Sequence, residues 1–168
     1  MLHVFKSLPL VRETHRSESL PERARAYGRD TITLGWEERL RARGRRRSDG
    51  GFEFGTTLLR GTTLHAGDCF VLDEPAIVVT VTERLERVFV VEPPTPMEWG
   101  LFAYCIGNSH QPLMLTTTAI VCPDVPGMEH VLAYHGIPFS RSTLAFTPVS
   151  LAGDLDLLGH RHSPERAP

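Results

Sequence analysis

The clearest candidate ligand for a metal ion is a single histidine within residues 107–112 (GNSHQP). The residues before this segment predict a helix and those after it predict a strand, so we expect His110 on a short turn just past a helix C-terminus. An imidazole in that position can project into solvent or against a partner molecule. Neutral imidazole is a good ligand for Ni²⁺, Cu²⁺ and Zn²⁺. The alternative is an ordinary loop histidine that makes only local hydrogen bonds.

Two further histidines lie close together near the end of the chain. Residues 159–162 (GHRH) carry His160 and His162, separated by one residue. On a mobile segment two such imidazoles can chelate one ion together, because the entropy of reaching the metal is lost once for both ligands. The alternative is a polar tail, or a scar left by an expression vector.

His130 is a third candidate, near the start of a second predicted helix. It lies off the apolar stripe that Met128, Val131 and Leu132 form, so we expect it to be exposed, as an auxiliary ligand or simply as a solvated helix residue. His135 lies near that stripe at the C-terminal end of the helix, where the helix dipole favours a cation. We interpret His135 as structural.

A run of arginines forms the other group that could do chemistry. Residues 39–47 contain six arginines in nine positions. Alternation in a strand would place Arg39, Arg41, Arg43, Arg45 and Arg47 on one face. Such a face could bind phosphate or an acidic partner protein, or it could simply be solvated.

Several functional classes are not supported by the sequence. It holds no GxSxG, HExxH, P-loop or GxGxxG motif and no paired carboxylates at a telling spacing, so we expect no enzyme activity. Its three cysteines are widely spaced without a CxxC pair, and its net charge is −2, which argues against nucleic-acid binding. No apolar stretch approaches the ~20 residues that cross a bilayer, and the N-terminus lacks a signal-peptide core. We therefore expect a cytoplasmic protein with no membrane partner.

Short strands with frequent turns are predicted for the first half of the chain. Residues 31–36, 69–72 and 76–82 are rich in β-branched and aromatic side chains. The turn signal of residues 48–51 (SDGG) separates the arginine run from residues 52–54, which predicts a hairpin. Residues 12–30 are polar and predict a surface loop. Together these features indicate a small antiparallel β-domain.

The second half of the chain predicts alternating strands and helices. Residues 88–91 form an apolar strand, after which Thr95 can cap a helix that has Pro at its first position and Glu98 three residues after the cap. Trp99, Phe102, Ala103 and Ile106 form one apolar face of this helix, while Leu101 and Cys105 lie on another, so we expect a second partner surface. Strand character returns in residues 113–121, with a possible turn at 116–118. The predicted second helix has Asp124 as its cap and Pro126 in its first turn, and ends at Gly136. Residues 144–146 form the last predicted strand.

This order of elements, βαββαβ, is the ferredoxin-like pattern. The sequence therefore predicts an α+β protein with three parts: an N-terminal β-domain at residues 1–86 for partner or peptide binding, a ferredoxin-like domain at 87–149, and a flexible histidine-bearing tail at 150–168.

The chain resembles the UreE family of urease accessory proteins in several segments that occur in the family's order. Residues 31–39 (TITLGWEER) resemble its T-L-x-W-E-E-R strand, and residues 58–68 (LLRGTTLHAGD) resemble its L-P-R-G-x-x-L-x-x-G-D segment. Residues 104–113 (YCIGNSHQPL) resemble Y-H-L-G-N-R-H-x-P-L. Residues 129–132 (EHVL) resemble D-H-V-L, and residues 138–148 resemble the closing strand.

The resemblance implies a nickel metallochaperone rather than an enzyme. It implies a homodimer formed through the ferredoxin-like domain, with a bridging histidine from each protomer (His110) and a tail that completes the site (His160 and His162). It also implies delivery of Ni²⁺ to the apo-urease maturation complex with the accessory GTPase UreG. Zn²⁺ and Cu²⁺ can compete for imidazole ligands, and raw affinity favours Cu²⁺.

This chain departs from the family pattern at several positions. Cys105, Ser109 and Glu129 replace the family's histidine, arginine and aspartate, and the tail holds only two histidines, which argues against high-capacity nickel storage. One rival function is a metal-independent module that docks an acidic partner through Arg39–Arg47. A small metallohydrolase is a weaker rival, because no general base is evident beside the candidate ligands.

Overall fold

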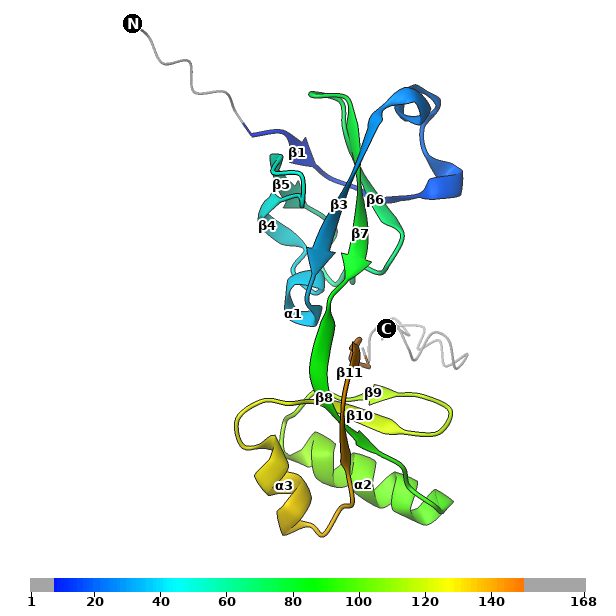
Figure 1. Cartoon of the computed structure of the whole chain (residues 1–168), viewed down its shortest axis with the longest axis vertical. Coiled ribbons are helices and arrows are strands. Elements are labelled where there is room, and N and C mark those ends of the chain that lie inside the picture. The colour runs from blue at the N-terminus through cyan, green and yellow to red at the C-terminus, as the bar shows by residue number, and fades with distance from the viewer. Residues whose placement is uncertain (1–7, 150–168) are drawn as a thin grey trace, which may run out of the picture. The chain divides into compact units, whose positions relative to one another are not determined.

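The protein consists of two units, each with its own strands (Figure 1). The boundary between them lies between Arg84 and Leu85. The computed structural model describes residues 8–149. The first unit contains β1 (Leu10–Val11), β2 (His15–Arg16), the 3₁₀ helices η1 (Ser17–Ser19) and η2 (Glu22–Ala26), β3 (Gly28–Leu34), α1 (Trp36–Arg39), β4 (Arg43–Arg47), β5 (Glu53–Thr57), β6 (Asp68–Leu72) and β7 (Ile77–Glu83). The second contains β8 (Leu85–Val91), α2 (Pro96–Asn108), β9 (Met114–Leu115), β10 (Ile120–Pro123), α3 (Met128–Tyr134) and β11 (Ser140–Ala145).

The first unit has two sheets, with strand orders β1-β5-β4 and β2-β6-β7-β3. Alternation along the strands places one apolar set between the sheets, where the rings of Phe54 on β5 and Phe70 on β6 meet at 5.4 Å. The other side of the second sheet packs Cys69 and Val78 against Leu20 and Ala24 of the 3₁₀ segment. Strands β6 and β7 therefore have buried residues on both faces, which explains the apolar runs at residues 69–72 and 77–79.

The predicted hairpin is confirmed as β4 and β5, but the arginine run is not a single strand. Residues Trp36–Arg39 form a helical turn, because Gly35 is extended and its N–H donates to the Glu38 carboxylate at 2.9 Å. This turn rotates Arg39 into the unit, where it is 1% exposed and pairs with Glu83 at 3.2 Å. The prediction that Arg39 shares a solvated face with the later arginines was wrong.

Two strand pairings of the first unit run parallel, which the sequence did not predict. β3 pairs with β7 from Gly28↔Ile77 to Leu34↔Glu83, and β1 pairs with β5. The direction of a neighbouring strand depends on contacts far apart in the sequence, whereas the local pattern reports only that a strand exists. Residues 12–30 are also more ordered than the predicted loop, since they contain β2, both 3₁₀ helices and the start of β3.

The second unit has the predicted ferredoxin-like arrangement, and the fold class is α+β as expected. Its sheet is antiparallel, with the order β11-β8-β10-β9. The register sets Phe89 opposite Cys122 and Val91 opposite Ile120. These four side chains share one sheet face, and both α2 and α3 pack on them (Figure 1).

Helix α2 begins as its sequence predicts, whereas α3 does not. The Thr95 hydroxyl accepts from the Glu98 N–H at 3.3 Å and donates to the Glu98 carboxylate at 2.6 Å. The α3 helix begins at Met128 after Gly127, whose φ of 87° is left-handed. Asp124 is not its cap, because this carboxylate pairs with Arg87 of β8 at 2.7 Å. None of the helices within residues 8–149 has both the length and the apolar character that crossing a membrane requires.

Candidate metal centre

The C-terminus of α2 determines where His110 lies. Ser109 closes the last turn. Its N–H donates to the Cys105 carbonyl at 3.3 Å and to the Ile106 carbonyl at 3.2 Å, and its hydroxyl donates to the Ile106 carbonyl at 2.7 Å. The His110 N–H then donates to the Gly107 carbonyl at 3.0 Å. His110 is exposed, as its position after the helix predicts.

The backbone of His110 is held in a conformation that histidine seldom adopts. Its φ is 58°, in the left-handed region that usually belongs to glycine after a helix. That conformation costs a residue with a Cβ about 1 kcal/mol. Such strain is found where the position of a side chain matters for function, so the turn marks His110 as a functional candidate.

The strain can be separated from the imidazole by two substitutions that both remove the ring. His110→Gly is expected to have a free energy of unfolding about 1 kcal/mol higher than His110→Ala, because glycine adopts positive φ without steric cost. Urea unfolding followed through Trp99 of the same unit, with Trp36 replaced by Phe in both variants, measures the difference. Equal stabilities would mean that the turn relaxes to negative φ when alanine replaces histidine.

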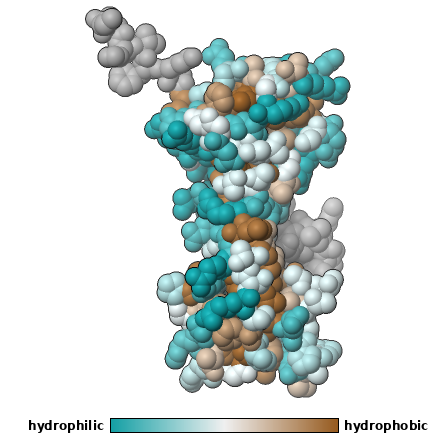
Figure 2. All heavy atoms as spheres, viewed as in Figure 1, coloured by the Kyte–Doolittle hydropathy of each residue, from teal (hydrophilic) through white to brown (hydrophobic). Residues whose placement is uncertain are grey.

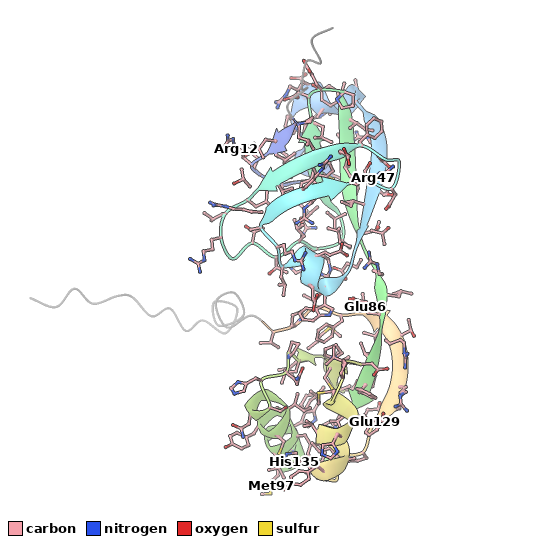
Figure 3. The ribbon with its side chains drawn as sticks, turned by 90° about the vertical axis from the view of Figure 1, so that its left-hand side faces the viewer. Arg12, Arg47, Glu86, Met97, Glu129 and His135 are labelled. Atoms are coloured by element: carbon pink, nitrogen blue, oxygen red, sulfur yellow. The ribbon has the colours of Figure 1, made fainter. Side chains whose placement is uncertain are left out.

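An exposed apolar stripe runs along α2 toward His110. Met97, Leu101 and Tyr104 are 82%, 54% and 68% exposed. Their spacing of four and three residues places them on one face of the helix. Asn108 lies on the same face, two residues before His110. Figure 3 labels Met97 beside the helix that carries this stripe. Contiguous exposed apolar side chains mark interaction surfaces.

The opposite face of α2 builds the core, largely as predicted. Phe102 and Ile106 are buried, and Trp99 and Ala103 pack against them. Leu101 lies on the second face, as expected. Cys105 does not belong there, because it is partly buried against the same core.

His110 has no set of ligands within its own described chain. Among residues 8–149, no group of three or more His, Cys, Asp or Glu side chains is close enough to hold a metal ion. Burial raises the pKa of Cys122 to about 12, so this cysteine stays a thiol and is a poor ligand. A metal at His110 therefore needs ligands from another copy of the chain or from outside the described residues.

The remaining candidate histidines fall into two groups. His130 is exposed on α3, as predicted, and its ring lies 6.3 Å from that of Tyr134, which in turn contacts His135 edge-on at 5.0 Å. No described metal-holding cluster joins His130 to His110. His160 and His162 lie outside the described residues.

The sequence pattern did not predict the positions of Tyr104 and Arg46. Tyr104, within the segment that singled out His110, belongs to the exposed stripe; its spacing from Leu101 could have revealed this. Arg46 points into the first unit, and burial lowers the pKa of its guanidinium. Its Nε–H donates to the Thr56 hydroxyl at 3.1 Å, a contact across the hairpin that no local pattern reports.

Comparison with known families gives two matches that together cover most of the chain. Residues 11–83 match the UreE urease accessory protein N-terminal domain, and residues 86–167 match the UreE urease accessory protein C-terminal domain. These two matches fall on the two units of the structure.

Individual relatives carry the same description. The chain is 31% identical to the urease accessory protein UreE of Burkholderia thailandensis over 79% of this chain and 60% of the relative. It is 32% identical to that of Bacillus cereus over 56% of this chain and 62% of the relative. It is 29% identical to the urease accessory protein UreE of Dechloromonas aromatica over 88% of this chain and 85% of the relative. The chain thus spans about three fifths of the length of the first two relatives.

Proposed function

The chain belongs to the UreE family of urease accessory proteins, and from this premise we propose that it is a nickel metallochaperone that serves urease maturation. In this proposal two copies bind one Ni²⁺ through His110 and deliver it to apo-urease with the GTPase UreG. The observation that supports this proposal is the place of His110: it is exposed at the end of the apolar stripe of α2, and the described part of its own chain does not supply enough ligands for a metal ion. The family name describes an accessory protein, which agrees with binding and transfer rather than catalysis.

Pairing of two copies would supply what one copy lacks. A two-fold interface brings the same residue from both subunits to one axis, so a lone imidazole becomes a pair. The stripe of Met97, Leu101 and Tyr104 offers apolar area for such an interface next to the histidine. In this scheme the ferredoxin-like unit is the dimerisation and metal-binding domain.

Further ligands come from the tail in this proposal. His160 and His162 add imidazoles that can leave the ion one at a time, so that a recipient takes over the coordination stepwise. A site with imidazole ligands and open positions suits transfer, whereas a closed thiolate site would retain the ion. The cargo is nickel because the family serves urease, while Cu²⁺ and Zn²⁺ remain competitors for the same donors.

Deletion of residues 159–168 tests this division of labour. We expect the shortened protein to bind Ni²⁺ about 10- to 100-fold more weakly, because two tethered ligands are lost, and to keep the mass of a dimer. Isothermal titration and analytical ultracentrifugation give the two readouts. The full-length double variant His160→Ala, His162→Ala is the matched control and should behave like the deletion. Unchanged affinity in both proteins, or monomers after deletion, would contradict the proposed role of the tail.

A further inference from the structure

A groove of about 430 Å³ in the first unit is lined by arginines that the nickel site does not use. Its walls are residues 32–34 of β3 and residues 43–47 of β4, with Glu38, Arg41 and Arg84 beside them. Both strands are the outermost members of their sheets. Consecutive residues of both strands line the groove, which therefore runs between two strand edges. In Figure 2, hydrophilic side chains gather over the part of this unit where Figure 1 shows α1 and β4.

The positive charge in the groove is only partly compensated. Arg45 pairs with Glu53 at 2.6 Å and Arg84 with Glu38 at 3.0 Å. Among the ion pairs of residues 8–149, none includes Arg41, Arg43 or Arg47, and these three side chains are exposed. Arg46 is buried and is held by neutral acceptors, among them the Thr56 hydroxyl and the Arg41 carbonyl. The groove thus concentrates cations on a chain whose net charge is −2.

The two walls differ in whether the backbone N–H and carbonyl groups at their edges already have hydrogen-bond partners. On the β3 side, Asp49 occupies the edge: its N–H donates to the Thr31 carbonyl at 2.8 Å, and its carboxylate accepts from Thr31 and Thr33. The hydrogen bond from the Thr31 hydroxyl is the main cause that lowers the pKa of Asp49, so this carboxylate stays charged and engaged. Asp49 therefore already occupies the Thr31 carbonyl and the Thr33 N–H at the free edge of β3.

Among the described residues, β4 is the last strand of its sheet, so no strand pairs with its outer edge. Across the hairpin, the Ser48 N–H donates to the Phe52 carbonyl at 2.9 Å, and the Leu58 N–H donates to the Ala42 carbonyl at 2.9 Å. In an antiparallel pair such backbone bonds recur at every second residue. The peptide groups of Arg43, Arg45 and Arg47 consequently point away from β5, toward the free edge. The same alternation places these three side chains on one face, where they are exposed.

We propose that this arginine groove docks an extended acidic segment of a partner protein along β4. A strand added to this edge would pair its main chain with β4, and carboxylates at every second residue would meet Arg43, Arg45 and Arg47. The open peptide edge favours a polypeptide over a nucleic acid, and none of the described residues that line the groove is an aromatic that could stack on bases. The inference is independent of the nickel site.

A synthetic peptide provides the direct test on the full chain. The probe is a fluorescein-labelled ten-residue peptide of alternating Glu and Thr, and its binding is followed by fluorescence anisotropy at low salt. The double variant Arg43→Glu, Arg47→Glu is expected to weaken binding about 10- to 100-fold. The matched control is Arg12→Glu, Arg60→Glu, which makes the same charge change at exposed arginines outside the groove and should change affinity little (Figure 3 shows the separation of Arg12 and Arg47).

Three further arms decide the chemistry of the occupant. A peptide with Gln in place of Glu should bind much more weakly, and so should the acidic peptide with alternate amides methylated. Equal weakening by both double variants, or equal binding of the Gln peptide, would overturn the proposal. Tighter binding of a ten-nucleotide oligothymidylate than of the acidic peptide would also overturn it in favour of a phosphate polymer. Nickel affinity should be unchanged in the groove variant, so failure here is distinct from failure of the nickel proposal.

Discussion

Replacing His110 with alanine is expected to lower the affinity for Ni²⁺ by about 100-fold or more. One substitution removes two ligands if the ion lies between two copies, and the remaining donors must then bind without the pair that organises them. The substituted side chain is exposed, so the fold of the second unit should survive. Isothermal titration of the variant, with circular dichroism as a check on folding, measures the effect.

The matched control for this substitution is His130→Ala. His130 is also exposed, but it lies on α3 beside Tyr134 rather than at the end of the α2 stripe. We expect its loss to change nickel affinity by less than about threefold, as for a solvated surface residue. If His130→Ala weakens binding as strongly as His110→Ala, the site includes α3 and the bridging scheme is incomplete. If His110→Ala binds nickel with unchanged affinity and stoichiometry, the scheme is wrong.

Replacing Leu101 with aspartate is expected to raise the dimer dissociation constant by about 100-fold. Leu101 is the middle residue of the exposed α2 stripe, 54% exposed in the single chain. A carboxylate there would be buried without a partner at the two-fold interface, where an apolar anchor contributes most to affinity. Sedimentation over a range of concentrations gives the constant. Nickel affinity should fall in parallel, because the pair of imidazoles exists only in the dimer.

Tyr134→Asp is the control for a charge placed on an exposed apolar residue. Tyr134 is 77% exposed on α3, so the chemical change is comparable while the α2 stripe stays intact. This variant should sediment as the wild type does. A monomeric Tyr134→Asp protein beside a dimeric Leu101→Asp protein would place the interface on α3 and overturn the role of the stripe.

Local signals were sufficient to predict the second unit well. The start of α2 follows from Thr95, Pro96 and Glu98 alone, because a cap and a first turn are made by neighbours in sequence. The order of strands and helices then restricts the topology to the ferredoxin-like arrangement that the structure has. The start of α3 was mispredicted because Asp124 forms an ion pair with Arg87 of β8, a contact that competes with capping.

In the first unit, the sequence pattern did not predict the position of Arg39 or the direction of the strand pairing. Alternating arginines suggested one strand, but the bond between Gly35 and Glu38 forms a helical turn that buries Arg39. The parallel pairing of β3 with β7 joins residues about fifty positions apart, beyond any local periodicity. His110 was singled out by its place after a helix, yet its left-handed backbone is a property of the turn that its residue type does not predict.

A crystal structure of the nickel-loaded protein tests the shared site most directly. The proposal predicts one ion on a two-fold axis, with an imidazole nitrogen of His110 from each of two copies at a bonding distance of about 2.1 Å. Nickel held by the side chains of one copy alone, with the two His110 rings too far apart to share it, would contradict the proposal.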